Sequence, residues 1–112
     1  MGLQLWITQF RKGLVELCVM ATLAEDEAYG YQIVERLGQI SGLTITESTV
    51  YPLLARLGRD QLLSVRTAAS PTGPPRRYYR LTEAGQRRLK EMAAYWQEMQ
   101  LSVQDLLKGV MT

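Results

Sequence analysis

The sequence predicts a mainly α fold of the α+β type, in which one β-hairpin stands between a group of helices and a long last helix. Three observations lead to this prediction. Apolar residues recur at helical spacing in segments before residue 60. Two β-prone runs flank a turn-forming segment at residues 68–75, and an apolar seam follows from residue 89 to residue 110. With 112 residues, of which 46% are hydrophobic, the chain suffices for one domain with a modest core.

The first ten residues are apolar, contain Trp6 and show no clear helix cap. We expect them to form either a short arm that packs on a partner or a frayed start. From Gly13 to Glu25 apolar side chains occur nearly all round, which is typical of a helix in the centre of a core. Cys18 lies within this run and is expected to be a buried thiol that behaves as a small hydrophobe.

A second helix is expected over residues 29–40, because apolar side chains mark one face of it and Ser41-Gly42 ends it. That buried face comprises Tyr31, Val34, Leu37 and Ile40, flanked by Ile33. A short β-like bridge, Leu43-Thr44-Ile45, then leads to the third helix.

The third helix is expected from Thr46 to Asp60, capped by Thr46 or Ser48. Pro52 is tolerated there only if it falls in the first turn or just past it. The apolar residues follow the spacing of one helix face and are Val50, Leu53, Leu54 and Leu57. The opposite face carries hydroxyls, a phenol and guanidiniums, namely Ser48, Thr49, Tyr51, Ala55, Arg56 and Arg59. Such a face suits hydrogen bonding to phosphates and base edges, although it also fits an ordinary amphipathic surface helix.

The next segment predicts a hairpin. Residues 62–67 and 76–81 favour strands, while the intervening Ala68–Pro75 segment favours a long, mobile turn. Arginines are frequent along the hairpin: Arg66, Arg76, Arg77 and Arg80. We expect Arg76 and Arg77 to hold DNA phosphates. The alternative is that both are merely solvated.

Thr82 is expected to cap the last helix, with Glu83 at the positive end of its dipole. The helix is predicted to reach Val110 and to measure roughly 40 Å. Its heptad seam comprises Leu89, Met92, Trp96, Met99, Val103, Leu106 and Val110. A seam that projects from so small a domain favours pairing with a second copy, and the alternative is a helix that folds back on its own core. The whole order predicts a winged helix-turn-helix domain over residues 1–81 with its N-terminal arm, and a C-terminal dimerisation helix over residues 82–112.

Basic residues concentrate in one part of the chain. Residues 56–90 carry nine basic and two acidic side chains, while the segments on either side carry an excess of acidic ones. This pattern indicates a single contact surface for an anionic partner. Glu16 and the acidic residues 25–27 argue against a signal peptide, and no run approaches the roughly 18 apolar residues that span a bilayer. We therefore expect a cytoplasmic protein without membrane contact.

Three motifs resemble the PadR family of bacterial transcriptional regulators, in particular its short members with one C-terminal helix. They are Tyr29-Gly30-Tyr31, the segment from Thr49 to Leu57, and the segment from Arg77 to Gly85. The resemblance covers about residues 10–95 and implies a dimeric DNA-binding protein, usually a repressor that an inducer or stress signal releases from its operator. Two positions depart from the family pattern: Gln61 replaces a usual glycine, and Gly58 replaces a usual charged residue. Gly58 is expected to end the third helix early and to redirect Arg59.

These features together predict that the protein binds double-stranded DNA at a near-palindromic operator. The residues expected to contact DNA are Ser48, Thr49, Tyr51, Pro52, Arg56, Arg59, Arg76 and Arg77. The alternative is a winged-helix module that binds a protein or a small apolar ligand without DNA, although such modules lack a basic wing. Catalysis, cofactors and metals are not expected, because the chain has no histidine and its lone cysteine lies in an apolar helix.

A ligand pocket at the dimer seam is a further expectation. Trp96 is too large for a tight two-stranded coil, so the helices either splay or stack their indoles on a planar apolar effector. Met92 and Met99 flank it and suit an adaptable apolar site. Trp6 is expected to close the mouth. The alternative is a fully packed tryptophan core.

Overall fold

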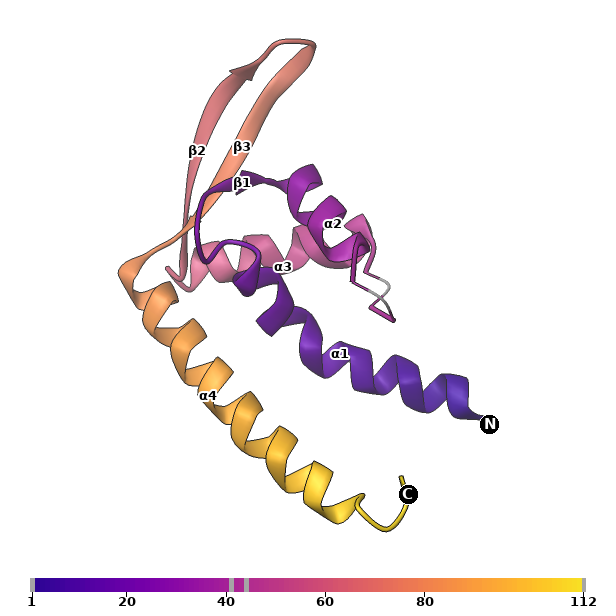
Figure 1. The fold of residues 1–112 in the computed structure, drawn as a ribbon. Helices are drawn as coiled ribbons and strands as arrows, with labels where there is room; N and C mark the ends of the chain where they lie inside the picture. Colours follow the sequence, from indigo (N-terminus) through magenta and orange to yellow (C-terminus); the bar gives the residue numbers. More distant parts are fainter. Residues whose placement is uncertain (1, 41, 44, 112) are drawn as a thin grey trace.

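The computed structural model describes residues 2–40, 42–43 and 45–111 and confirms a winged-helix fold with a long C-terminal helix (Figure 1). The elements in order are α1 (Leu3–Ala21), β1 (Ala28–Tyr29), α2 (Gly30–Gly38), α3 (Glu47–Arg59), β2 (Leu63–Ser70), β3 (Gly73–Leu81) and α4 (Glu83–Leu106). The domain is elongated, 55 × 31 × 21 Å, because α1 and α4 both extend beyond the rest of it (Figure 1). None of the described helices combines the length and the apolar content needed to cross a lipid bilayer.

The core lies where the three-helix unit meets the base of the hairpin. Its buried side chains come from α1, α2, α3, the three strands and the loops between them, and are Val19, Met20, Leu23, Ala28, Ile33, Leu37, Leu43, Ile45, Val50, Leu54, Leu57, Leu62, Leu63, Tyr79 and Leu81. This packing fixes α3 against α2 and the hairpin, so that the opposite face of α3 remains in solvent.

Helix α1 differs from the prediction at both ends. Residues 3–10 are helical and continue without interruption into the predicted helix, because neither proline nor a cap separates them. The helix ends at Ala21 rather than Glu25. Only its last turn enters the core, so the expected central core helix is wrong for most of its length. Cys18 is half-buried beside the core, and burial raises the pKa of its thiol.

Helix α2 begins at Gly30 because Tyr29 belongs to strand β1. Its buried face consists of Gly30, Ile33 and Leu37, which recur at spacings of three and four. The predicted face is wrong for Tyr31 and Ile40, which are exposed, while Val34 packs against the edge of the core. The expected stop at Ser41 and the bridge through Thr44 fall on residues outside those described.

Helix α3 agrees with the predicted apolar face: Val50, Leu54 and Leu57 are buried. Thr46 is the N-cap residue, but its hydroxyl lies 2.8 Å from that of Ser48 and makes no capping bond to the helix. Pro52 is the sixth residue of the helix and interrupts none of it. The expected early end at Gly58 is wrong, because the helix continues to Arg59 and Asp60 caps it.

Gln61 takes the backbone conformation that links α3 to the hairpin. It has a φ of 61°, in the left-handed region that favours glycine, and it is the one such non-glycine residue among those described. Its carbonyl oxygen accepts a 2.8 Å hydrogen bond from the Thr82 hydroxyl, so the turn is tied to the start of α4.

Replacing Gln61 with glycine is expected to stabilise the fold by about 1 kcal/mol, because a side chain in the left-handed region costs roughly 1–2 kcal/mol and the freedom of glycine in the unfolded chain offsets part of that gain. The thermal midpoint should rise by about 4–8 °C. Gln39→Gly is the matched control, since Gln39 has a φ of −82° and gains nothing from glycine. An unchanged or lower midpoint for Gln61→Gly would show that this turn is not strained.

The sheet has the order β1-β3-β2, with antiparallel pairing throughout. The hairpin is longer than predicted and its tip is shorter. Strand pairing reaches from Leu63↔Leu81 to Ser70↔Gly73, which leaves Pro71-Thr72 as the turn. The expected long loop over residues 68–75 is therefore wrong. Pro74 and Pro75 are accommodated because a bulge disturbs the ladder there and β1 pairs only further down, at residues 78 and 79.

Helix α4 begins as predicted: the Thr82 hydroxyl accepts a 3.0 Å hydrogen bond from the Gly85 N–H, and Glu83 lies in the first turn. The helix ends at Leu106, so the prediction that it reaches Val110 is wrong. Of the heptad residues, Leu89 and Met92 pack against the core of their own chain. The remaining five side chains are exposed, up to 81% for Leu106.

Candidate nucleic-acid interface

The solvent-facing side chains of α3 point in three directions. At about 100° per residue, Ser48, Pro52 and Arg59 point directly away from the buried stripe. Tyr51 lies on the flank toward α2 and the hairpin, and Arg56 lies on the flank toward α1. Ser48, Thr49, Pro52 and Arg59 are all exposed. The helix therefore presents hydroxyls and a guanidinium outward while its two flanks contact neighbouring elements.

Tyr51 is held against the start of α2. A methyl group on Gly30 would lie only 2.3 Å from Cε1 of the Tyr51 ring, so the ring uses the space that glycine leaves open. The ring remains 42% exposed. Burial of the phenol, with the Glu47 carboxylate and the Tyr79 phenol nearby, raises the pKa of Tyr51. Its hydroxyl is therefore protonated at neutral pH and able to donate a hydrogen bond.

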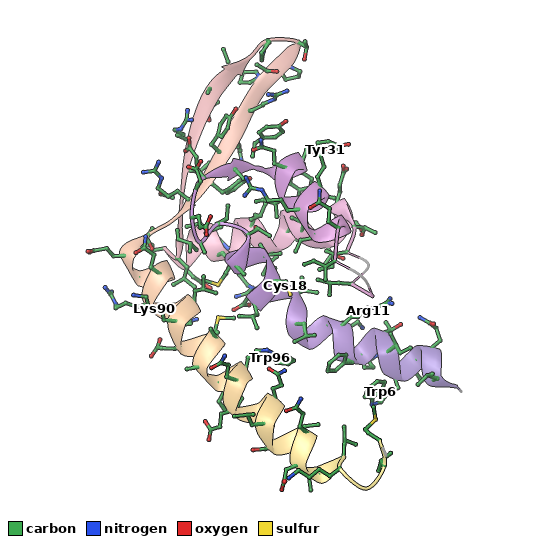
Figure 2. All side chains as sticks on the ribbon, in the orientation of Figure 1. Trp6, Arg11, Cys18, Tyr31, Lys90 and Trp96 are labelled. Atoms are coloured by element: carbon green, nitrogen blue, oxygen red, sulfur yellow. The ribbon has the colours of Figure 1, made fainter. Side chains whose placement is uncertain are left out.

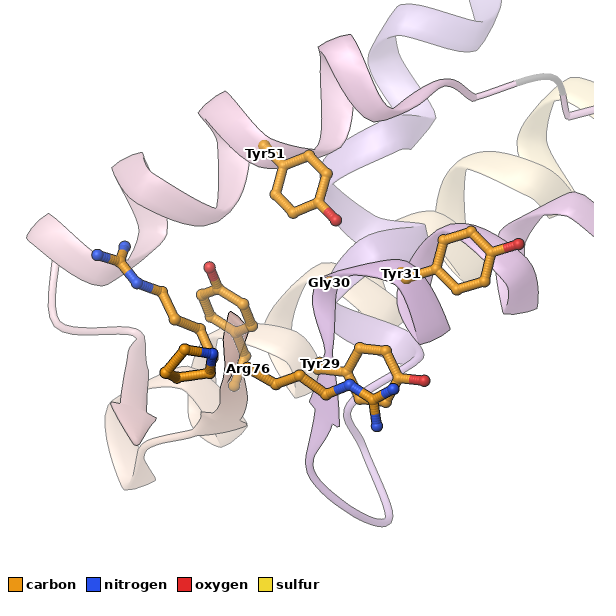
Figure 3. Close-up of a pocket in the computed structure, with 8 residues that line it drawn as sticks. Tyr29, Gly30, Tyr31, Tyr51 and Arg76 are labelled. Atoms are coloured by element: carbon orange, nitrogen blue, oxygen red, sulfur yellow. The ribbon is translucent and has the colours of Figure 1, made fainter. Parts of the chain in front are cut away.

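A hollow of about 630 Å³ separates Tyr51 from the hairpin (Figure 3). Residues from β1, α2, α3 and β3 line it: Tyr29, Gly30, Tyr31, Tyr51, Pro75, Arg76, Arg77 and Tyr79. Phenols and guanidiniums are among the lining groups, and their O–H and N–H donors can bind phosphate oxygens.

Arg76 and Arg77 lie on opposite faces of the hairpin, because successive side chains of a strand alternate. Arg77 shares the face of the buried Tyr79, which is directed toward the helices. Arg76 shares the outer face with Tyr78. The structure thus brings both arginines to the rim of one hollow, from different sides of the strand.

The outer face also carries Arg66 and Arg80, which are partly neutralised. Arg66 donates hydrogen bonds from Nε to both carboxylate oxygens of Glu27, at 2.9 and 3.2 Å, and Arg80 approaches the same carboxylate at 3.9 Å. The hydrogen bond from Arg66 lowers the pKa of Glu27, while Glu27 raises that of Arg66. These two arginines therefore contribute less free positive charge than the sequence suggested.

Arg56 is likewise engaged within the chain. Its guanidinium forms an ion pair with Glu16 of α1 and a longer one, 3.5 Å, with Asp60. The hydrogen bond from Arg56 to Glu16 raises the arginine's pKa. About half of the side chain remains exposed, so contact with DNA requires the guanidinium to share or leave these carboxylates.

Sequence reasoning missed four residues that shape this site: Glu16, Glu27, Tyr29 and Gly30. The two carboxylates act on arginines about forty positions away, and no local pattern encodes such pairs. The other two belong to the Tyr29-Gly30-Tyr31 motif, which indicated the family but not a role at this site. Its glycine admits the Tyr51 ring, and its first tyrosine pairs with Tyr78 on the neighbouring strand.

A second, apolar cavity of about 560 Å³ lies between α1 and α4. Its lining includes Gly13, Leu14, Leu17, Met92, Tyr95, Trp96 and Met99, with Arg88 and Glu91 beside them. Figure 2 shows Trp96 on the side of α4 that faces α1. The structure thus brings three of the four predicted pocket residues together. Trp6 is not among the lining residues, and its ring stacks on Phe10 at a centroid distance of 5.4 Å.

An exposed polar helix packed beside a basic two-stranded wing, followed by a long C-terminal helix, defines a winged helix-turn-helix protein of the transcriptional regulator class. Residues 19–91 match the Transcriptional regulator PadR-like family, and the chain belongs to that family. The family is one of transcriptional regulators rather than of enzymes.

Similar proteins cover from about three quarters to more than nine tenths of the chain. A transcriptional regulator of Mycobacterium tuberculosis is 34% identical over 83 residues, which are 74% of this chain and 76% of that protein. A PadR-like transcription factor from Bacteroides fragilis is 41% identical, with a TM-score of 0.74, over 88% of this chain and 95% of the other. A PadR family regulator from Eggerthella lenta has a TM-score of 0.82 at 34% identity, over 94% and 91%.

The fold is also similar to that of Bacillus subtilis PadR, which was solved in complex with operator DNA. The two chains are 23% identical, with a TM-score of 0.67, over 71% of this chain. This chain corresponds to 46% of that one.

Proposed function

We propose that this regulator binds a near-palindromic operator as a homodimer and represses transcription until a small apolar effector releases it. The observation that carries the DNA-binding part is the hollow between α3 and the wing, which Tyr51, Arg76 and Arg77 line beside an exposed polar helix face. The operator complex of the similarly folded Bacillus subtilis protein supports the same use of this fold.

In the proposed complex α3 enters the major groove and the wing follows the phosphate backbone. Ser48 and Pro52 face the groove directly, Tyr51 donates its hydroxyl from the wing side, and Arg59 extends beyond them. Arg56 contributes once its ion pairs with Glu16 and Asp60 loosen. The full set is Ser48, Thr49, Tyr51, Pro52, Arg56, Arg59, Arg76 and Arg77.

Arg77→Ala is expected to weaken binding to all duplexes alike and to reduce the salt slope by roughly 1, because each phosphate contact releases about one counterion. Arg66→Ala is the matched control on the same wing, since Glu27 already neutralises Arg66. Its slope should stay close to that of the wild type. The measurement is the dissociation constant at several salt concentrations. Equal slopes for wild type and Arg77→Ala would show that this face of the wing does not touch the backbone.

The homodimer is proposed from the apolar surface that the chain leaves exposed. Large apolar side chains are exposed on the outer half of α1, on the C-terminal part of α4 and on the residues that follow it: Leu3, Leu5, Trp6, Phe10, Val103, Leu106, Leu107, Val110 and Met111. A second copy related by two-fold symmetry would bury both surfaces at once. Trp6 is then an interface residue, and the heptad residues from Trp96 onward form the seam.

The proposed effector site is the cavity between α1 and α4, which a second copy would help to enclose. Met92, Trp96 and Met99 offer a planar indole and adaptable thioethers to a flat apolar compound. We expect the dimer to adopt two states that differ in the distance between the two recognition helices. The compound changes DNA affinity only as far as it binds one of these states more tightly than the other.

Titration with planar cationic dyes is expected to change tryptophan emission in the wild type and in Trp6→Phe, and to leave Trp96→Phe unaffected. The reason is that Trp96 lines the cavity, whereas Trp6 stacks on Phe10 outside it. Intrinsic fluorescence gives the measurement. Wild-type emission that is blue-shifted and indifferent to every dye would assign Trp96 to packing alone and remove the effector site.

The second candidate function is a winged-helix module that binds a protein or a small apolar ligand without DNA, which the apolar cavity favours. A filter-binding assay on genomic fragments separates the two. The proposed function predicts salt-sensitive retention of a subset of fragments. If no fragment is retained, the alternative function is favoured. If all fragments are retained equally, the protein binds DNA without sequence preference.

A further inference from the structure

Tyr29 holds one of the wing arginines by stacking. The Arg76 guanidinium carbon lies 4.3 Å from the centroid of the Tyr29 ring, which is the geometry of a cation–π contact (Figure 3). The Tyr29 ring in turn meets Tyr78 edge to face, with centroids 5.5 Å apart and an interplanar angle of 75°. Tyr29 and Tyr78 are direct partners in the β1–β3 ladder, so the backbone fixes where the ring lies.

The outer face of the wing offers an internal comparison. Arg66 stacks on the Tyr78 ring in the same manner, at 4.4 Å, but its charge is paired with Glu27. Within the described residues the ion-paired cations are Arg56, Arg66, Arg80 and Lys108. Arg76 is therefore held in place by an aromatic ring while its charge remains available to an external anion.

We propose that Tyr29 is a positioning residue for DNA binding, whose ring holds the Arg76 guanidinium at the rim of the hollow to receive a backbone phosphate. The inference rests on the proposed DNA-binding function. A free arginine side chain loses rotamer freedom when it binds, whereas one already stacked on a ring has lost part of that freedom beforehand. Tyr29 thus strengthens a phosphate contact without touching DNA itself.

Arg77 provides the matched control because it lies on the opposite face of β3, away from the Tyr29 ring. If Tyr29 acts through Arg76, removing both side chains should cost no more than removing Arg76 alone. Removing Tyr29 and Arg77 together should instead multiply their separate effects, since sites without a shared partner are additive. This difference separates positioning from a general effect on the wing.

The experiment measures binding of the full-length protein to a fluorescein-labelled, mixed-sequence duplex of about 30 base pairs, long enough for two half-sites. Tyr29→Leu is expected to weaken binding by about three- to tenfold, the range for one immobilised side chain. Tyr29→Phe keeps the ring and should bind like the wild type. Tyr29→Leu added to Arg76→Ala should not weaken binding further. Added to Arg77→Ala, it should weaken binding by the same factor as it does in the wild type.

Three outcomes would overturn the inference: wild-type affinity in Tyr29→Leu, an undiminished effect of Tyr29→Leu in the Arg76→Ala background, or an equal loss in Tyr29→Phe. Failure of the proposed function gives a distinct result, because the wild type itself would then show no salt-dependent binding to the duplex.

A second measurement does not depend on the folding of Tyr29→Leu. In the wild type, proton NMR should place the Arg76 side-chain δ protons upfield of ordinary arginine shifts, because they lie over an aromatic ring. Arg76→Ala assigns the resonance, and Tyr29→Phe should retain it. Ordinary shifts for these protons in the wild type would show that the stack does not form in solution, and would overturn the inference.

Discussion

Met99→Asp combined with Val103→Asp is expected to convert the protein to a monomer and to weaken operator binding by at least a hundredfold. Both side chains lie on the exposed apolar stripe of α4, and two charges there would have to be desolvated in the proposed dimer. Monomers lose the effective concentration that couples two half-sites, which is worth about 10²–10⁴ in affinity. Sedimentation velocity gives the oligomeric state, and fluorescence anisotropy gives the DNA affinity.

Gln97→Asp combined with Gln104→Asp is the matched control. Both glutamines are exposed on α4 and point away from the stripe, so the same two charges should leave the dimer intact. A Met99→Asp/Val103→Asp variant that still sediments as a dimer would show that the interface lies elsewhere. A monomer that binds the operator as tightly as the wild type would instead contradict the proposed two-fold reading of DNA.

Gly85→Ala is expected to cost about 2 kcal/mol of stability and to lower the thermal midpoint by roughly 8–16 °C. A methyl group on Gly85 would lie 2.1 Å from the Leu62 carbonyl oxygen and 3.3 Å from Cδ2 of Leu81. That oxygen also accepts the Thr82 N–H hydrogen bond at 3.1 Å, so it cannot move without disturbing the start of α4. Part of the cost is offset because alanine favours a helix over glycine.

Gly58→Ala is the control for this effect. Gly58 also lies within a helix, but a methyl group there would meet no atom within 4 Å. The change should therefore raise stability by about 0.5–1 kcal/mol. Thermal unfolding followed by circular dichroism compares the two variants. If both substitutions shift the thermal midpoint in the same direction, the close approach of Gly85 to the hairpin is not the reason that a glycine is needed there.

Sequence periodicity was sufficient to predict those helices that bury one regular face. The α3 stripe of Val50, Leu54 and Leu57 and the Thr82 cap of α4 both follow from local spacing. Strand β1 has only two residues, so no period identifies it, and its existence depends on pairing with β3. That pairing took Tyr29 out of α2. The buried face of the helix keeps the predicted Leu37 but has Gly30 and Ile33 in place of Tyr31 and Ile40.

The sequence was sufficient to predict which residue types form the candidate DNA surface, but not which of its arginines keep their charge free. The sequence indicated a basic wing, but the carboxylate of Glu27, which precedes Arg66 by 39 residues and lies still further from Arg80, decides which arginines are partly neutralised. Strand alternation over the predicted residues 76–81 already separates Arg76 from Arg77, but it does not predict that the strand begins at Gly73. The two prolines concealed this extension, because a bulge and a missing third strand accommodate them. Gln61 illustrates the reverse case, in which a departure from the family pattern marks a left-handed backbone position.

The most direct test of DNA recognition by α3 and the wing is selection of bound sequences from a random duplex library, followed by sequencing. We expect the wild type to enrich an inverted repeat whose half-sites lie about 10 base pairs, or a multiple of that, apart. Arg77→Ala should enrich the same sequence from a smaller bound fraction, since a phosphate contact carries no sequence information. A library that returns no enriched sequence, or only isolated half-sites, would contradict sequence-specific binding by a two-fold dimer.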